Sequence, residues 1–425
     1  MKKALLFAAL LASSLYGFSQ KQYLQCGAIL DMETGRLQPG VTLVVEGNEI
    51  RELLKGYQSG TDSDAVVDLK DYTVLPGLID MHVHIESESS PQSYIKRLTM
   101  NPADIAYEAA VYAERTLMAG FTTVRDLGGS GVNIALRKAV DKGLVPGPRI
   151  YTAGKSIATT GGHADPTNGR RLDEMGNPGP GEGVVNSPED GRQAVRQRYK
   201  EGSDVIKITA TGGVLSVAKN GQNPQFTIEE IRAITETAKD YGMLTAAHAH
   251  GDEGMQRAIK GGIRTIEHGT LMSEETMALM KEYGVYMVPT ISAGKEAARL
   301  ADVPGYFPEV VAIKAREIGP QIQNTFSRAY KKGVPIAFGT DAGVFKHGTN
   351  AQEFGYMVEA GMPAVEALQA ATLTNASLLG MGQRLGQLKA GFLADIIAVP
   401  GNPLEDVGTL MDVRFVMKDG RIFKQ

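Results

Sequence analysis

The sequence is poor in cysteine and in tryptophan, with one cysteine, Cys26, and no tryptophan among 425 residues. A single cysteine excludes an intramolecular disulfide and a structural zinc site built from several thiolates. An excess of charge of one sign is lacking too, because the formal net charge is only −4. Without a basic field or a run of like charges, no nucleic-acid partner is expected, and small molecules are the expected partners.

Long apolar runs are also lacking. The first twenty residues, MKKALLFAALLASSLYGFSQ, start with Lys2 and Lys3, continue with about a dozen mostly apolar residues and reach the small residues Gly17 and Ser19. This pattern predicts a secretory signal peptide at residues 1–20, with an apolar part too short to span a membrane. We expect a periplasmic or secreted protein that does not associate with the membrane once the signal is removed. A lipid anchor at Cys26 is disfavoured, since YLQCG lacks the small residues of such a site.

Two β-rich ends flank a different middle part. Residues 22–72, and LADIIAV and VRFVMKDGRIF near the C-terminus, are short segments of alternating polarity separated by turn residues. Residues 21–72 plus 384–425 are therefore predicted to form one small β-sandwich domain.

Residues 73–383 alternate strand-like apolar runs with helical segments, several of which open at a Ser or Thr cap and close at Gly. The expected strands lie at 75–84, 121–128, 149–154, 204–210, 243–250, 264–269, 285–291 and 335–342. Eight strands, each followed by a helix, predict an α/β protein with a TIM (β/α)8 barrel. The glycine-rich stretch from 159 to about 181 follows the third strand and is expected to cover the catalytic end of the barrel.

Five of the seven histidines fall where an expected strand ends. In a TIM barrel this is the active-site face, and alternation places two histidines that are two residues apart on one side of a strand. A lone histidine is more often a hydrogen-bonded core residue. Five at one rim favour a divalent cation, which satisfies all the imidazoles at once. These histidines are His82, His84, His248, His250 and His268.

Two further residues end expected strands at the same face. Lys207, in DVIKIT, would place an ammonium among apolar neighbours, which lowers its pKa. Asp341, in AFGTDAG, supplies a carboxylate, although Gly-Thr-Asp alone also fits an ordinary turn. Imidazoles, a lysine and a carboxylate that converge favour a hydrolytic metal centre over a closed structural zinc site.

In this order, and with GQLKAGFLADIIAV near the C-terminus, these residues resemble the metal-dependent amidohydrolase superfamily over essentially the whole mature chain. The motifs TTGGH, IKITATGGVLS, AAHAHG, TIEHG and GTDAGVFKHG resemble its branch of Xaa-Pro dipeptidases, imidazolonepropionase-like proteins and carboxypeptidases, which includes bacterial hydrolases of N-acylated aromatic amino acids such as ochratoxin.

The resemblance implies two divalent metal ions, usually zinc. It implies that His82, His84 and Asp341 hold the more buried ion and that His248 and His268 hold the more exposed one. Lys207 would bridge the two as a carbamate derived from carbon dioxide. The implied reaction is amide hydrolysis by a metal-bridging hydroxide, with Asp341 as the proton carrier.

Two histidines remain for the substrate. His163, in the glycine-rich stretch, is expected to stabilise the oxyanion, although a surface loop histidine is the alternative. His250 replaces a tyrosine found in many relatives and is expected to contact the substrate carboxylate. An exchange of roles with His248, which would make His250 the ligand, stays open. His347, in FKHGTN, is expected to structure a loop.

The predicted activity is removal of a C-terminal amino acid from dipeptides or N-acyl amino acids. The protein is expected to form a homo-oligomer, because large homo-oligomers are common in this branch. The first alternative is hydrolysis of a cyclic amide or lactone, as in imidazolonepropionase-like relatives. A one-metal deaminase is a further alternative. A non-catalytic binding protein on the same scaffold is the alternative from another class.

Overall fold

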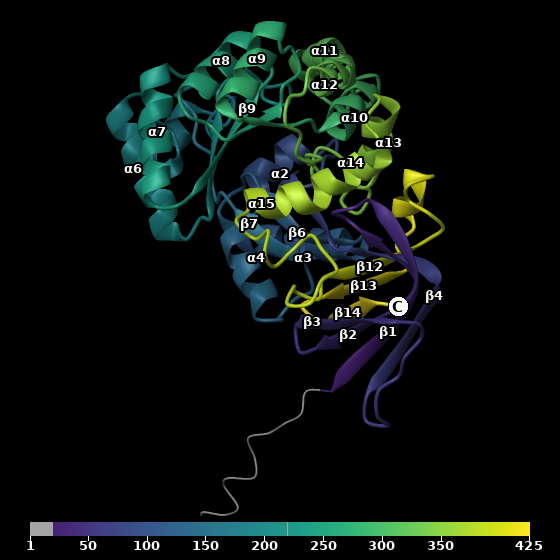
Figure 1. Ribbon diagram of the computed structural model, residues 1–425. Helices are drawn as coiled ribbons and strands as arrows, with labels where there is room; N and C mark the ends of the chain where they lie inside the picture. The colour runs from purple at the N-terminus through teal and green to yellow at the C-terminus, as the bar shows by residue number, and fades with distance from the viewer. Residues whose placement is uncertain (1–19, 219) are drawn as a thin grey trace, which may run out of the picture.

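The computed structural model describes residues 20–218 and 220–425 (Figure 1). Except for Gln20, the predicted signal peptide lies outside the described residues. Within the described part of the chain, no helix combines the length and the apolar character needed to cross a bilayer.

Strands from both ends of the chain share one seven-stranded sheet, drawn in purple and yellow in Figure 1. The order across this sheet is β14-β13-β12-β4-β1-β2-β3. The pairing of β12 with β4 joins the two ends, and Cys26 lies in the apolar core of the sheet, where burial raises the pKa of its thiol to about 12. The strands are β1 (Lys21–Asp31), β2 (Arg36–Glu46), β3 (Glu49–Lys55), β4 (Ala65–Pro76), β12 (Ile396–Pro400), β13 (Phe415–Lys418) and β14 (Arg421–Lys424).

Parallel strands make up the middle of the chain, in two sheets of three and four strands. The bridge between Ile157 and Ile208 links the two sheets on one side. All six residues of β5 are buried, as expected for a strand covered on both faces. These strands are β5 (Leu78–Val83), β6 (Phe121–Asp126), β7 (Arg149–Thr152), β8 (Val205–Thr209), β9 (Leu244–Ala249), β10 (Thr265–His268) and β11 (Tyr286–Val288).

The expected eighth strand, 335–342, is not a regular strand but occupies the predicted place. Its backbone binds β11 through the bridge of Met287 with Ile336, and binds β5 through the bridge of Val83 with Ala342. Between these two bridges the ladder is interrupted, and Asp341, next to the second bridge, has a left-handed backbone with φ of 60°. The pairings thus pass round a ring of eight segments and return to β5.

The first expected strand, 75–84, is divided in the structure. Residues up to Pro76 belong to β4 of the seven-stranded sheet, and β5 begins at Leu78. Gly77 separates them at a point where a Cβ atom would lie 2.2 Å from Oγ1 of Thr122. Only glycine fits this close approach, so the chain passes there from one sheet to the other.

Helices follow the strands and pack around the ring (Figure 1). Their ends carry local signals: Thr227 and Glu230 form a capping box at the start of α7, and α6 ends at Gly202 with φ of 97°. In the part of the chain that the structure describes, the helices of more than five residues are α2 (Ser93–Thr99), α3 (Pro102–Met118), α4 (Val132–Asp141), α6 (Pro188–Glu201), α7 (Ile228–Asp240), α8 (Asp252–Lys260), α9 (Glu274–Tyr283), α10 (Ile291–Ala301), α11 (Glu309–Ile318), α12 (Ile322–Lys331), α13 (Gln352–Glu359) and α14 (Ala364–Gln369).

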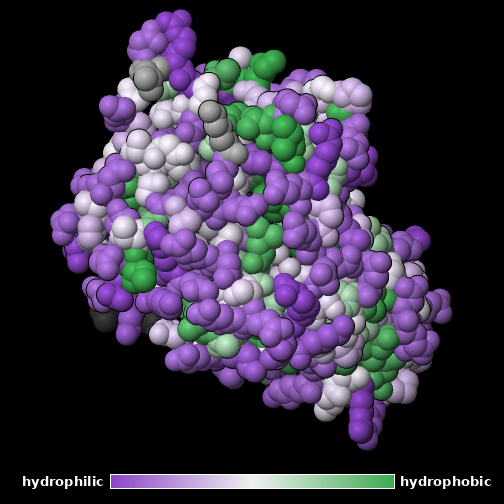
Figure 2. All heavy atoms as spheres, turned by 90° about the horizontal axis from the view of Figure 1, so that it is seen from above, coloured by the Kyte–Doolittle hydropathy of each residue, from purple (hydrophilic) through white to green (hydrophobic). Residues whose placement is uncertain are grey.

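The glycine-rich stretch after β7 is mostly irregular, as expected. It contains only the short helix α5 (Leu172–Met175) and the turn η1 (Pro180–Glu182). Arg170 in this stretch donates to the carbonyl of Arg97 on α2 at 2.8 Å, so the stretch contacts the helix that follows the first ring strand. The outer face seen in Figure 2 is mainly hydrophilic, with apolar side chains in separate patches.

Candidate active site

The carboxyl ends of the ring strands bring the predicted ligands together. Oδ1 of Asp341 lies 3.4 Å from Nε2 of His82 and 3.4 Å from Nε2 of His84. The ring centroids of His82 and His268 are 5.1 Å apart, and those of His248 and His268 are 4.7 Å apart. Side chains as far apart in the sequence as those of His82 and Asp341 therefore meet at one end of the ring.

Each of the five imidazoles has one ring nitrogen bound to the protein. Nδ1 of His82 donates to Glu267 at 2.9 Å, Nδ1 of His84 to the carbonyl of Gly128 at 2.7 Å, and Nε2 of His248 to that of Gly212 at 3.1 Å. Nδ1 of His268 pairs with Thr290 at 2.7 Å, and Nδ1 of His250 with Thr270 at 2.9 Å. No described residue forms a hydrogen bond with the second nitrogen of any of these rings. Proteins orient metal-binding histidines in this way.

Several buried atoms in this cluster have no hydrogen-bond partner. They include Nε2 of His82 and Oδ1 of Asp341. Unpaired buried polar atoms are costly, and ligand atoms of His82, His268 and Asp341 all lie within 4.8 Å of one another. A second such group is formed by His248, His250 and His268. The donor set fits divalent metal ions, and every member of both groups is a buried residue.

Burial sets the protonation of the cluster. It lowers the pKa of His84 to about 4 and holds the pKa values of His82, His248 and His268 well below their usual range. Burial, and then the nearby Lys314 ammonium, lowers the pKa of His250 to about 3. The imidazoles are therefore neutral at pH 7, which is the form that binds metal.

Lys207 and Asp341 face the same site from β8 and from the eighth segment. Burial lowers the pKa of the Lys207 amine, against the opposing effect of the Glu267 and Asp341 carboxylates. Burial likewise raises the pKa of Asp341, although the charge of Lys207 acts in the other direction. Lys207 is only 3% exposed, so desolvation favours the neutral form of both groups until a cation supplies charge.

The backbone is strained at the site. Among the described residues, the non-glycine residues with positive φ are His268, Thr290, Asp341 and Asp419. His268 at 71° and Asp341 at 60° are predicted ligands, and Thr290 at 52° binds the ring of His268. Left-handed conformations cost free energy and often occur at functional sites. In a regular strand the side chains of Glu267 and His268 would point to opposite faces, yet Glu267 binds His82 and the ring of His268 lies beside that of His248.

His163 lies beside the cluster, as predicted. Its ring stacks on that of His248 with the centroids 4.4 Å apart, and its backbone N–H donates to Gln225 at 2.8 Å. The ring is flush against Gly213, where a Cβ atom would lie 2.2 Å from Cε1 of His163. Nδ1 of His163 is buried and has no protein partner. The ring of His163 therefore packs against the cluster, from a residue of intermediate exposure.

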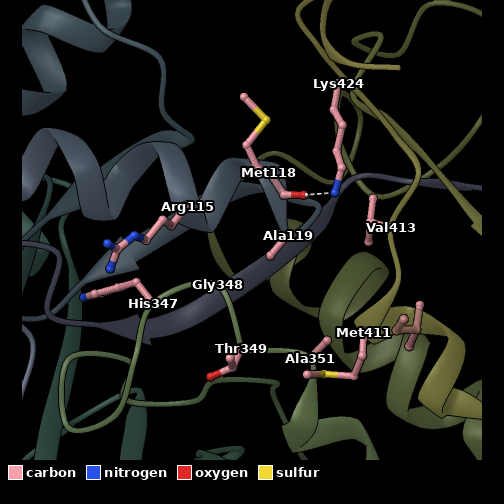
Figure 3. A pocket seen from close by; sticks show the side chains of 11 residues that line it. Arg115, Met118, Ala119, His347, Gly348, Thr349, Ala351, Met411, Val413 and Lys424 are labelled. Carbon is pink, nitrogen blue, oxygen red and sulfur yellow. Dashed lines mark hydrogen bonds between the residues drawn. The ribbon is translucent and has the colours of Figure 1, made fainter.

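His347 is placed away from the cluster. It lines a cavity of about 300 Å³ between α3 and the C-terminal segment, together with Arg115 and Lys424 (Figure 3). Its Nε2 donates to the carbonyl of Ser87 at 2.9 Å, and its ring stacks on Tyr112. These contacts support the predicted role of His347 in structuring a loop.

Two charged residues of the site were not predicted. Arg125 on β6 and Glu267 on β10 are completely buried and form an ion pair of 2.8 Å. Arg125 also donates to the carbonyl of Met81 at 2.6 Å, and Glu267 accepts from His82. The available signal was a charged residue within a strand that is expected to be buried, in TTVRDLG and TIEHG, since a buried charge requires a partner.

The acidic segment ESESS, 86–90, has structural contacts. The Glu86 carboxylate accepts from the backbone N–H groups of Ser130 and Asn133, at 2.6 Å each, where α4 begins. Glu88 accepts from the backbone N–H of His347 at 3.0 Å. A helix N-terminus stabilises a nearby carboxylate through its unpaired N–H groups and the helix dipole. Glu86 therefore fastens the loop after β5 to α4.

Glu86→Ala is expected to lower the free energy of unfolding by about 2 kcal/mol, because two charge-assisted hydrogen bonds are lost. Urea unfolding measures this change, with Glu33→Ala at an exposed position as the control. Relative rates on different substrates are expected to stay the same. A changed substrate preference without loss of stability would contradict the assignment and place Glu86 at the substrate.

Imidazoles, a lysine and a carboxylate at the carboxyl ends of parallel strands are typical of metal-dependent hydrolases. Comparison with known proteins identifies the family within this class of hydrolases. Residues 73–423 match the amidohydrolase family, and the chain belongs to this family.

Relatives with more specific activities are similar over most of the chain. A Xaa-Pro dipeptidase crystallised with methionine in its active site is 52% identical and covers 96% of this chain and 100% of its own, with a TM-score of 0.93. A prolidase complexed with N-methylphosphonate-L-proline is 32% identical, with coverage of 96% and 100% and a TM-score of 0.87. Ochratoxinase of Aspergillus niger is 35% identical, and the match covers 83% of this chain and 75% of that enzyme.

Proposed function

We propose that this amidohydrolase is a binuclear enzyme that removes the C-terminal amino acid from dipeptides or N-acyl amino acids. The observation that carries the proposal is the buried cluster in which each imidazole keeps one nitrogen free beside Asp341 and Lys207. The relatives point to the substrate class: one is a Xaa-Pro dipeptidase with bound methionine, one is a prolidase and one is an ochratoxinase.

The residues that would hold the ions are those predicted from the sequence. His82, His84 and Asp341 would hold the more buried ion, and His248 and His268 the more exposed one. Two bound divalent ions, most simply zinc with this donor set, would acidify water and polarise the scissile carbonyl. Lys207 would lie between the two positions.

Lys207 is suited to form a carbamate. Its neutral amine, which burial favours, attacks carbon dioxide; a C–N bond forms and one proton is released to solvent. The product carries a carboxylate with two oxygens and one negative charge. Such a group suits a position between two cations and replaces an unfavourable buried ammonium.

The remaining roles belong to side chains at the edge of the cluster. Asp341 accepts the proton of the attacking water and gives it to the leaving amine, since its carboxylate faces the centre of the site. His163 donates to the developing oxyanion, and His250, held by Thr270, donates to the substrate carboxylate. Because both rings are neutral, each donates from one N–H group.

We also propose the architecture and setting that the sequence predicted. The ring of eight segments corresponds to a (β/α)8 barrel of residues 73–383, and residues 21–72 with 384–425 form the small β-sandwich domain. We propose that the protein is periplasmic or secreted, acts on small-molecule amides or peptides and assembles as a homo-oligomer.

The test is a hydrolysis screen with protein loaded with zinc. The panel holds dipeptides and N-acyl amino acids that differ in the C-terminal residue, together with a cyclic amide and a lactone. Free amino acid is expected from the linear substrates, and treatment with a chelator is expected to abolish its release until zinc is returned. Protein that binds two ions yet hydrolyses only the cyclic compounds, or nothing, would refute the proposed substrate class.

A further inference from the structure

Lys314 on α11 is a buried lysine outside the set of predicted ligands. It is 4% exposed, and among the residues that the structure describes it takes part in no ion pair. Its Nζ instead donates to three backbone carbonyls, those of Gly213, Ser216 and Ala218, at 2.8, 2.7 and 2.8 Å. Three acceptors require the three N–H donors of an ammonium, so the contact depends on the charged form.

These carbonyls belong to one segment that follows β8, residues 212–218, which we call the 212–218 loop. Tyr94 of α2 holds the same loop from another side, since its hydroxyl donates to the carbonyl of Leu215 at 2.9 Å. Val214 packs against apolar residues of α10 and α11. The 212–218 loop therefore bridges helices that follow different ring strands.

The loop contacts two imidazoles of the site. The carbonyl of Gly212 accepts from Nε2 of His248 at 3.1 Å and so fixes which nitrogen of that ring faces the cluster. Gly213 lies flush against the ring of His163, which in turn stacks on His248. Lys314 thus binds Gly213, which packs against the ring of His163. The preceding residue, Gly212, binds the ring of His248.

We propose that Lys314 is a positioning residue: its ammonium locks the 212–218 loop in the conformation that orients His248 and supports His163. Without the ammonium, three carbonyls in a buried environment lose their donor. The loop is then expected to open more often, because it has few other hydrogen bonds that hold it to the barrel.

The experiment compares the full-length protein with two variants. Lys314→Met keeps a long side chain but removes the N–H donors, and Lys314→Arg keeps the positive charge and N–H donors. Lys332→Met, at an exposed position, is the control. Hydrogen exchange of the backbone amides in the 212–218 loop is the first measurement. Lys314→Met is expected to accelerate this exchange by about tenfold or more, since at least one net hydrogen bond is lost. Arg is expected to restore most of the protection.

The second measurement is steady-state hydrolysis, and only this part rests on the proposed function. Lys314→Met is expected to lower kcat by about a hundredfold, as displaced catalytic groups do, with a smaller change in KM. Unchanged loop exchange would overturn the proposal, and so would faster exchange with unaltered kcat. If the parent enzyme hydrolyses nothing, the proposed function fails while the exchange result still decides whether Lys314 locks the loop.

A more conservative substitution keeps the proposal testable if Lys314→Met does not fold. If thermal unfolding shows that Lys314→Met is not folded, Lys314→Gln retains two N–H donors without charge. In this variant the amides of the 212–218 loop alone are expected to exchange faster than in the parent protein, but more slowly than in a loop that is fully released. Protection equal to that of the parent in Lys314→Gln would show that the ammonium is not needed and would overturn the proposal.

Discussion

Arg125→Met is expected to lower the free energy of unfolding by about 3–5 kcal/mol, because it leaves the Glu267 carboxylate buried without its ion-pair partner. Both side chains are completely buried, and the two lie 2.8 Å apart. The guanidinium also donates to the carbonyl of Met81 and to Thr265, so the substitution removes three hydrogen bonds at once. Urea unfolding monitored by circular dichroism measures the loss.

Two comparisons distinguish the effect of losing the buried ion pair from the effect of losing a positive charge elsewhere in the protein. Arg51→Met removes an arginine that is half exposed and paired with Glu46, and it is expected to cost about 1 kcal/mol or less. The double variant Arg125→Met with Glu267→Gln removes the unpaired charge and is expected to be more stable than Arg125→Met alone. Equal losses for Arg125→Met and Arg51→Met would contradict the assigned role.

The ion pair has a consequence for the site as well as for stability. Glu267 accepts from Arg125 with one oxygen and from Nδ1 of His82 with the other. The pair therefore fixes the tautomer of His82 and directs its Nε2 to the cluster. A charged network at the centre of the ring thus connects the fold to the orientation of a predicted ligand.

The positions of the predicted ligands could be inferred from the sequence because parallel strands impose them. His82 and His84 are two residues apart on one strand, and the carboxyl ends of successive parallel strands meet at one face. No side-chain detail is needed for that inference. Lys207 and Asp341 followed from the same rule, and the structure places all of them together.

Residues that act through backbone contacts could not be predicted in this way. The ring of His268 lies in the cluster and its backbone is left-handed, although regular alternation from Glu267 would direct the side chain away. The division of the first expected strand at Gly77 depends on the distance to Thr122, which no local pattern records. Lys314 is 107 residues from Lys207 in sequence, and its role depends on how the 212–218 loop folds back.

Asp341→Asn is expected to lower kcat by about a thousandfold, the middle of the range for loss of a general acid–base group. The amide keeps the size of the side chain and one oxygen, but it cannot accept the proton of the attacking water. Oδ1 of Asp341 lies 3.4 Å from Nε2 of both His82 and His84, so the substitution also weakens the metal position. Steady-state kinetics and metal content must therefore be measured on the same samples.

The two roles of Asp341 are separable by this pair of measurements. If the asparagine variant binds two ions and still loses kcat, proton transfer by the carboxylate accounts for the loss, because an amide oxygen can bind metal but has no useful basicity. If one ion is lost and excess zinc restores kcat, the carboxylate serves mainly as a ligand. Asp412→Asn, at a half-exposed position paired with Arg414, is the matched control and is expected to keep full activity. Full activity and unchanged metal content in Asp341→Asn would exclude both roles, because no other described carboxylate lies within 3.4 Å of the free nitrogens of His82 and His84.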